Sequence, residues 1–211
     1  MTNNKTSHKQ DPHYQKAKKE GYRARSAYKL LEIQKRYNIF KRAFYILDLG
    51  CAPGSWLQIS KKFAEDNLIK YDDQYYHRNE YKILGVDFKK VSPIENIVTL
   101  QMDFTKPMFQ NKIESFFHDK IDLILSDASI NKTGNKFSDH IKQINLCHKI
   151  LELAKIYLKF KGVLVMKAFQ GTDFNSFVAK MKSEFRLSKT FKPSSSKKKS
   201  NEIYLIGIQK K

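Results

Sequence analysis

The stretch Phe44–Trp56 constrains the fold more than any other part of the chain. An apolar run, Phe44–Leu49, contains a single acid, Asp48, and is followed by a short segment that begins at Gly50 and ends at Gly54. A helix-like apolar pattern comes next. A buried strand followed by a glycine-containing turn and a helix is the usual first unit of an open α/β sheet. In such sheets ligands bind beyond the carboxyl ends of the strands. The spacing is not that of a dinucleotide or phosphate loop, so the pattern leaves a nucleotide-like cofactor site and an ordinary tight turn both open.

Apolar strands and helix-like segments alternate along the rest of the chain. We expect seven strands, at residues 44–49, 83–87, 97–102, 121–126, 162–168, 186–191 and 203–208, with helices at residues 55–66, 136–160 and 173–185. This alternation predicts an α/β fold with a doubly wound, mainly parallel sheet and helices on both faces.

The remaining segments suggest a simple domain organisation. Residues 1–10 are polar and contain no apolar run, so we expect a disordered basic tail ahead of a single domain at residues 11–211. Residues 11–37 predict two helices separated by Gly21, with Asp11 and Pro12 as an N-cap and first-turn pair. The polar, tyrosine-rich segment 67–82 lacks a clear period, and we interpret it as an inserted surface loop.

The charge balance favours a polyanionic partner. The chain has 40 Lys and Arg residues against 21 Asp and Glu, a formal net charge of +19. Such a field attracts nucleic acid, although a solvated lysine-rich surface is the alternative interpretation. The basic residues cluster near both ends, and the candidate RNA contacts are Lys16, Lys19, Arg23, Arg25, Lys197, Lys198 and Lys199.

Several classes of protein are not favoured. No run approaches the roughly 20 apolar residues of a membrane helix. Cys51 and Cys147 form no framework or metal-binding pattern, and no histidine shares ligand spacing with them. We therefore expect an intracellular monomer with two reduced core thiols, no metal and no membrane contact, in a compartment that the sequence does not decide.

Charged residues stand at the ends of the predicted strands. Asp48, Asp87, Asp103 and Asp127 each lie at or near the carboxyl end of a strand built from Ile, Leu and Val, and Lys167 lies in another. A buried charge needs a partner, and one such acid is commonly a helix N-cap. Several of them at one sheet edge favour a bound polar or cationic molecule, with the acid after the second strand holding a ribose.

A series of motifs resembles one family over nearly the whole chain from Asp11. These are DPHYQKAK running into GYRARSAYKL, LDLGCAPGSW at residues 47–56, Ser126-Asp127, VMKAFQG at residues 165–171, KPSSS at residues 192–196, and NEIY at residues 201–204. They are similar to the FtsJ/RrmJ family of S-adenosylmethionine-dependent ribosomal RNA ribose 2′-O-methyltransferases. The resemblance implies the Rossmann-like fold of class I methyltransferases. It also implies large-subunit ribosomal RNA, at a uridine and of bacterial or organellar type, as the substrate.

The resemblance also implies the site residues. The family's catalytic tetrad falls on Lys29, Asp127, Lys167 and Glu202. Cofactor contacts fall on Gly54, Trp56, Asp87, Asp103 and Asp127, and their neighbours Gly50, Ala52, Pro53 and Phe104 are further candidates. We expect Lys167, when neutral, to act as the general base and Asp127 to orient it, while Glu202 fixes Lys29 or the target hydroxyl.

Two departures from the family pattern affect the substrate side. The family's Asp-Met-Ala-Pro-Asn is Asp127-Ala128-Ser129-Ile130-Asn131 here, and losing the proline frees the backbone at Ile130. The arginines usual before Glu202 are lysines here, which keep the charge but lose bidentate pairing with phosphate.

Three alternatives remain at this point. A transfer RNA anticodon-loop 2′-O-methyltransferase would share the N-terminal motif and the tetrad. A non-catalytic RNA-binding factor in ribosome assembly would keep the fold but would have no use for the tetrad. A small-molecule methyltransferase does not account for the charge of +19.

Overall fold

The computed structural model describes residues 11–71, 78–131, 133–197 and 200–211. Its strands are β1 (Tyr45–Leu49), β2 (Lys82–Asp87), β3 (Val98–Gln101), β4 (Ile121–Ser126), β5 (Leu158–Phe169), β6 (Phe185–Phe191) and β7 (Glu202–Lys210). Its helices are α2 (Pro12–Lys19), α3 (Ala27–Tyr37), α4 (Ser55–Lys70), α5 (Met108–Phe117), α6 (Lys136–Tyr157) and α7 (Phe174–Glu184).

The strands form one seven-stranded sheet in the order β3-β2-β1-β4-β5-β7-β6. The pairs β1–β2, β1–β4, β2–β3 and β4–β5 are parallel, whereas β7 lies antiparallel between β5 and β6. The chain order reverses between β1 and β4, which is the switch point where open α/β sheets bind ligands. The predicted doubly wound, mainly parallel sheet is confirmed.

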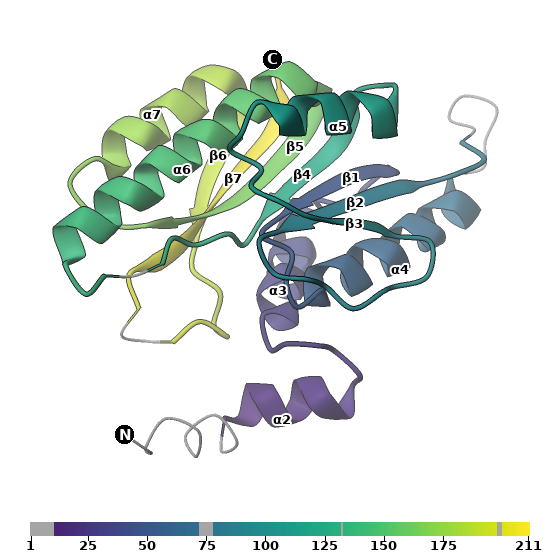
Figure 1. Cartoon of the computed structure of the whole chain (residues 1–211), viewed down its shortest axis with the longest axis horizontal. Coiled ribbons are helices and arrows are strands. Elements are labelled where there is room, and N and C mark those ends of the chain that lie inside the picture. Colours follow the sequence, from purple (N-terminus) through teal and green to yellow (C-terminus); the bar gives the residue numbers. More distant parts are fainter. Residues whose placement is uncertain (1–10, 72–77, 132, 198–199) are drawn as a thin grey trace.

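Helices cover both faces of the sheet (Figure 1): α5, α6 and α7 lie on one face, and α3 and α4 on the other. Successive residues of a strand therefore enter different cores. In β1, Leu47 joins the core beneath α5, α6 and α7, while Ile46 joins the core beneath α3 and α4. Every residue of β1 and β4 is buried, which explains why these central strands are nearly continuous apolar runs.

The predicted N-terminal helices are also confirmed, with Gly21 between them at φ +77°. The Asp11 carboxylate caps α2 by accepting from the amides of His13 and Tyr14. Helix α2 lies apart from the body of the molecule (Figure 1). The Tyr28 hydroxyl of α3 donates to Glu20 at 2.9 Å, which ties the end of α2 to α3.

Several element boundaries differ from the sequence prediction; for example, α6 ends at Tyr157, three residues before its expected end at residue 160. Helix α4 continues to Lys70, so residues 67–70 are helical and do not belong to the inserted loop. Asn67 is buried because its side-chain amide donates to the carbonyls of Phe40 and Ala43. Helix α5 was not predicted at all, and β5 begins four residues earlier than expected, at Leu158. Residues 72–77 of the predicted loop and the tail at residues 1–10 lie outside the described residues.

The described residues contain neither a membrane-spanning helix nor a metal-binding cluster. No helix within them is long and apolar enough to cross a membrane. Across the same residues, no group of three or more His, Cys, Asp or Glu side chains is arranged to hold a metal ion. Both cysteines are free and buried.

Candidate active site and cofactor cavity

A cavity of about 630 Å³ lies beyond the carboxyl ends of β1, β2 and β4. Its lining comes from the turn after β1, the residues after β2 and β3, residues 127–131 after β4, and Leu146 of α6. The volume is within the range of roughly 300–1,000 Å³ that is usual for small-molecule sites. The position is the one that the switch point between β1 and β4 predicts.

Five of the predicted cofactor residues line this cavity, namely Gly50, Ala52, Asp87, Phe104 and Asp127. The Asp87 carboxylate is held in place because its Oδ2 accepts from the Ala52 amide at 2.9 Å and its Oδ1 from the Lys89 amide at 2.8 Å. A carboxylate has about four acceptor positions, so both oxygens keep capacity for ribose hydroxyls. This geometry at the end of β2 is compatible with a ribose, and ribose binding by Asp87 stays a prediction.

The other four predicted residues, Pro53, Gly54, Trp56 and Asp103, are not among the lining residues of this cavity. At Gly54 the space that a side chain would need belongs to Arg23, whose Nη1 lies 2.9 Å from the position of an added Cβ. Trp56 is buried, and its indole donates to the Ser26 carbonyl at 2.9 Å. The Asp103 carboxylate accepts from the amide and hydroxyl of Thr105. Cofactor contact by these four residues stays a prediction.

Asp48 lies beneath the glycine turn and not at the rim. Its side chain is fully buried, and both carboxylate oxygens lack a hydrogen-bond partner among the described residues. Burial raises the pKa of Asp48 well above its usual range, and the nearby negative charges of Asp127 and Asp87 raise it further. Folded protein therefore keeps a proton on Asp48 that the unfolded chain releases above a pH of about 4.

We expect Asp48→Asn to be stabilising at neutral pH relative to the native protein. A raised carboxyl pKa makes the native free energy of unfolding fall as the pH rises above about 4, and asparagine cannot ionise. Urea denaturation of both proteins at pH 5 and pH 8 measures this. The advantage of the variant should grow between the two values, and a constant difference would contradict the buried, unpaired carboxyl group.

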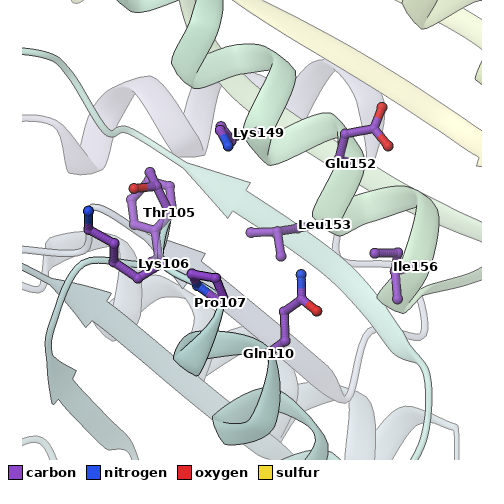
Figure 2. Close-up of a pocket in the computed structure, with 9 residues that line it drawn as sticks. Thr105, Lys106, Pro107, Gln110, Lys149, Glu152, Leu153 and Ile156 are labelled. Atoms are coloured by element: carbon purple, nitrogen blue, oxygen red, sulfur yellow. The ribbon is translucent and has the colours of Figure 1, made fainter.

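A second hollow lies beside the cavity, between α5 and α6 (Figure 2). Gln110 of α5 and Leu153 of α6 face it, with Lys149 and Glu152 on the same helix as Leu153. Its volume is about 220 Å³, below the usual range for small-molecule sites. The larger cavity at the switch point is therefore the candidate cofactor site.

The predicted tetrad is assembled next to this cavity. Asp127 follows β4, and Lys167 lies in β5, the next strand of the sheet. The Lys167 ammonium donates to the Asp127 carbonyl at 2.6 Å and lies 3.2 Å from the Asp127 Oδ1. Because Asp127 also lines the cavity, Lys167 lies next to the candidate cofactor site.

Lys29 and Glu202 form the second pair of the tetrad. Lys29 comes from α3 and Glu202 opens β7, and the Lys29 ammonium donates to the Glu202 carboxylate. The two residues are 173 positions apart in the chain and both are largely buried. The structure thus brings all four predicted catalytic residues to one place, from α3, β5, β7 and the end of β4.

Tyr204 joins the two pairs and was not predicted as a site residue. It is fully buried in β7, and its hydroxyl donates to the Asp127 Oδ1 at 2.6 Å and lies 3.5 Å from the Glu202 Oε1. Burial, with the Asp127 and Glu202 carboxylates, raises the pKa of Tyr204 well above its usual range, so the hydroxyl keeps its proton. The signal in the sequence is the spacing: Tyr204 is two residues after Glu202 and so shares its face of the strand.

We expect Tyr204→Phe to lower kcat by about tenfold to a hundredfold, because a hydrogen bond to a charged group contributes roughly 1.5–3 kcal/mol. Single-turnover methyl transfer measures the effect. Tyr157→Phe is the control, since the Tyr157 hydroxyl also donates to a carboxylate, that of Glu114 at 2.9 Å, away from the site. Equal losses in the two variants would contradict a role for Tyr204 in the site.

Glu32, also missed from the sequence, anchors the segment that precedes Glu202. The Glu32 carboxylate accepts from the amide and hydroxyl of Ser194 at 2.6 and 2.9 Å and from the Ser195 amide at 3.0 Å. Burial acts to raise the pKa of Glu32, but these hydrogen bonds outweigh it and lower the pKa. Helix α3 therefore holds the C-terminal segment both at Glu32 and at Lys29.

The predicted RNA contacts fall into two groups. Lys16, Lys19 and Lys197 are exposed, while Lys198 and Lys199 lie outside the described residues. Arg25 is paired with the Asp11 carboxylate. The Arg23 guanidinium donates to the carbonyls of residues 53, 92 and 93, so it braces the loops behind the cavity. Direct contact of these residues with RNA stays a prediction.

Solved structures share the fold. A ribosomal RNA methyltransferase from Plasmodium falciparum is 31% identical with a TM-score of 0.75, and the match covers 90% of this chain and 98% of that one. The fibrillarin/Nop5p complex matches with a TM-score of 0.52 at 19% identity, over 80% of this chain and 74% of that one, which supports the fold alone.

Curated relatives and a family model identify the family to which the chain belongs. Proteins named "Ribosomal RNA large subunit methyltransferase E" are 40% identical in Rickettsia akari and 36% identical in Methanobrevibacter smithii. Each match covers 95% of this chain, with 85% and 90% of the respective relative. The sequence model described as FtsJ-like methyltransferase matches residues 22–210. The chain belongs to the FtsJ-like methyltransferase family.

Proposed function

We propose that the protein, acting as a monomer, transfers the methyl group of S-adenosylmethionine to a ribose 2′-hydroxyl of large-subunit ribosomal RNA. The observation that carries the proposal is the contact of Lys167 with Asp127, which itself lines the cofactor cavity. A binding module has no need of an amine held by a carboxylate at that place. The names of the curated relatives support ribosomal RNA of the large subunit as the substrate.

The cavity fits S-adenosylmethionine. Asp87 is positioned to accept from ribose hydroxyls, and the missing side chain of Gly50 lets the turn after β1 pack against the Ala128 backbone in the cavity wall. S-adenosylmethionine supplies a methyl group already activated by a positively charged sulfur. The task of the protein is therefore to align that methyl group and to make the 2′-hydroxyl a better nucleophile.

The tetrad provides the base and its supports. The Lys167 side chain would accept the proton of the 2′-hydroxyl and later pass it to water, while bound S-adenosylmethionine would give up its methyl group to the 2′-oxygen and leave as the neutral thioether. Asp127 holds Lys167 through its carbonyl and carboxylate oxygens. The Lys29–Glu202 pair, joined to Asp127 through Tyr204, fixes the opposite side of the target hydroxyl.

Methyl incorporation into purified RNA tests the proposal. Tritiated S-adenosylmethionine should label large ribosomal subunits isolated from cells that lack this protein, at a ribose 2′-oxygen of the large-subunit RNA. Labelling of transfer RNA in place of the subunits would favour the anticodon-loop alternative. Tight binding of S-adenosylmethionine without labelling of any cellular RNA would favour a non-catalytic role in ribosome assembly.

We expect the affinity for RNA to fall steeply with salt, because neutralised phosphates release counterions on binding. Lys16→Ala with Lys19→Ala should lower the slope of log affinity against log salt by up to about two units, since each phosphate contact contributes up to about one. Filter binding between 50 and 200 mM salt measures the slope. Lys112→Ala, an exposed change on α5, is the control. An unchanged slope in the double variant would remove α2 from the RNA-binding surface.

A further inference from the structure

The loop after β4 carries the chemistry but has no regular secondary structure. It contains Asp127, and residues 128–131 line the cofactor cavity. A segment outside helices and strands has no ladder of backbone hydrogen bonds. Its position is therefore fixed by the hydrogen bonds that other groups make to its peptide N–H and C=O groups. Which groups hold this loop therefore decides how well Asp127 is placed.

A single side chain, Gln143 of α6, makes two hydrogen bonds to this loop and a third to β5. Its Nε2 donates to the Ala128 carbonyl at 3.2 Å, and its Oε1 accepts from the Ile130 amide at 3.2 Å. The same Nε2 also donates to the Lys167 carbonyl at 3.1 Å. Gln143 is fully buried, so no water competes with these bonds. Two carbonyls and one amide fix which end of the Gln143 side chain is oxygen.

These contacts reach both members of the catalytic pair. Ala128 is joined directly to Asp127, and the Lys167 carbonyl belongs to the residue that acts as base. Cys147, one turn further along α6, donates to the same Lys167 carbonyl at 3.4 Å. Helix α6 thus sets the distance between the two backbones that carry the acid and the amine.

The Ile130 amide explains why this chain tolerates the loss of the family's proline. A proline at position 130 would fix φ but would have no N–H to donate. Here the amide is present and finds a buried acceptor in Gln143. The backbone freedom expected from the sequence is removed by a hydrogen bond in place of a ring.

We propose that Gln143 is a positioning residue that holds residues 128–130 against β5 and so keeps Asp127 opposite Lys167, in partnership with the Ile130 amide. The proposal rests on the proposed function for its kinetic consequences. Gln143 touches no reacting atom, so it acts through the two backbones that it joins.

An isosteric change tests the donor role. Gln143→Glu replaces the Nε2 by an oxygen and sets it against two carbonyls, so kcat should fall at least tenfold while the KM for S-adenosylmethionine changes less than threefold. Ile150→Val, a buried change on the same helix away from the loop, should lower the melting temperature without lowering kcat. An unchanged kcat in Gln143→Glu overturns the proposal.

A rescue experiment separates positioning from general stability. Gln143→Ala leaves the Ile130 amide without its acceptor, and Ile130→Pro leaves the Gln143 Oε1 without its donor, so each variant should lose several-fold in kcat. The double variant contains neither the Ile130 N–H nor the Gln143 Oε1, and its proline restrains the loop. It should be more active than Gln143→Ala, which shares its loss of the Nε2 donor to the Ala128 and Lys167 carbonyls. A double variant no better than Gln143→Ala overturns the proposal.

Hydrogen exchange gives a result that does not depend on the substrate. The Ile130 amide should exchange at least tenfold faster in Gln143→Ala than in the native protein, while amides of β5 beyond Lys167 stay protected. Equal protection of the Ile130 amide overturns the proposal even if the native protein methylates ribosomal RNA. Faster exchange in a protein that methylates no RNA would instead reject the proposed function and leave the positioning role intact.

Discussion

Lys167→Ala should abolish methyl transfer and leave the binding of S-adenosylmethionine nearly unchanged. The substitution removes the amine that Asp127 holds, and general base catalysis contributes roughly 10²–10⁴ in rate. Lys167 is not among the residues that line the cofactor cavity, so the binding surface keeps its shape. Single-turnover transfer to ribosomal subunits and calorimetric titration with S-adenosylmethionine measure the two properties separately.

Lys180→Ala is the control for the loss of one positive charge, because Lys180 is exposed on α7. It should keep full kcat. A Lys167→Ala protein that retains more than a tenth of native kcat would reject Lys167 as the base, and equal weakening of cofactor affinity and rate would place it in the binding site.

Gly50→Ala should unfold or severely destabilise the protein and remove cofactor binding. Gly50 has φ +77°, and an added Cβ would lie 2.6 Å from the Ala128 Cα and 2.8 Å from the Ala128 amide nitrogen. The clash is with backbone, so it cannot be relieved by a rotamer change. We expect a loss of about 3 kcal/mol or more in the free energy of unfolding, the sum of backbone strain and overpacking.

Gly21→Ala is a control that separates the cost of backbone strain from the cost of steric overlap. Gly21 has the same φ of +77°, but nothing lies within 4 Å of an added Cβ there. This control should lose about 1 kcal/mol and keep its affinity for S-adenosylmethionine. Denaturant titration of the two variants measures the difference, and similar losses would mean that the turn after β1 can move away from the Ala128 backbone.

The strands were predictable because their apolar runs reflect burial on both faces, as in β1 and β4. The rim residues Asp87 and Asp127 follow from the same reasoning, since the carboxyl ends of parallel strands meet at one edge. The pattern does not distinguish Asp48, which is buried beneath that edge, from Asp87, which lines the cavity. Asp48 is the last residue but one of β1, whereas Asp87 is the last residue of β2, and this single position separates a buried acid from one at the cavity.

Features that depend on partners far away in the chain could not be predicted from the sequence. Asn67 continues α4 into the predicted loop because it bonds to carbonyls 24 and 27 residues earlier. Tyr204 and Gln143 look like ordinary strand and helix residues until β7 and α6 are packed beside β5. The spacing of Tyr204 from Glu202 places the two on one face of a strand, but the contacts of Tyr204 with Asp127 and of Gln143 with the loop after β4 emerge only with the tertiary structure.

The place of β7 in the sheet has a consequence for the timing of activity. The last strand of the chain is inserted between β5 and β6, and its first residue completes the pair with Lys29. A ribosome-bound chain that stops short of residue 202 therefore leaves β6 without its neighbour and the tetrad without Glu202. A chain truncated before β7 is therefore expected to show no methyl transfer.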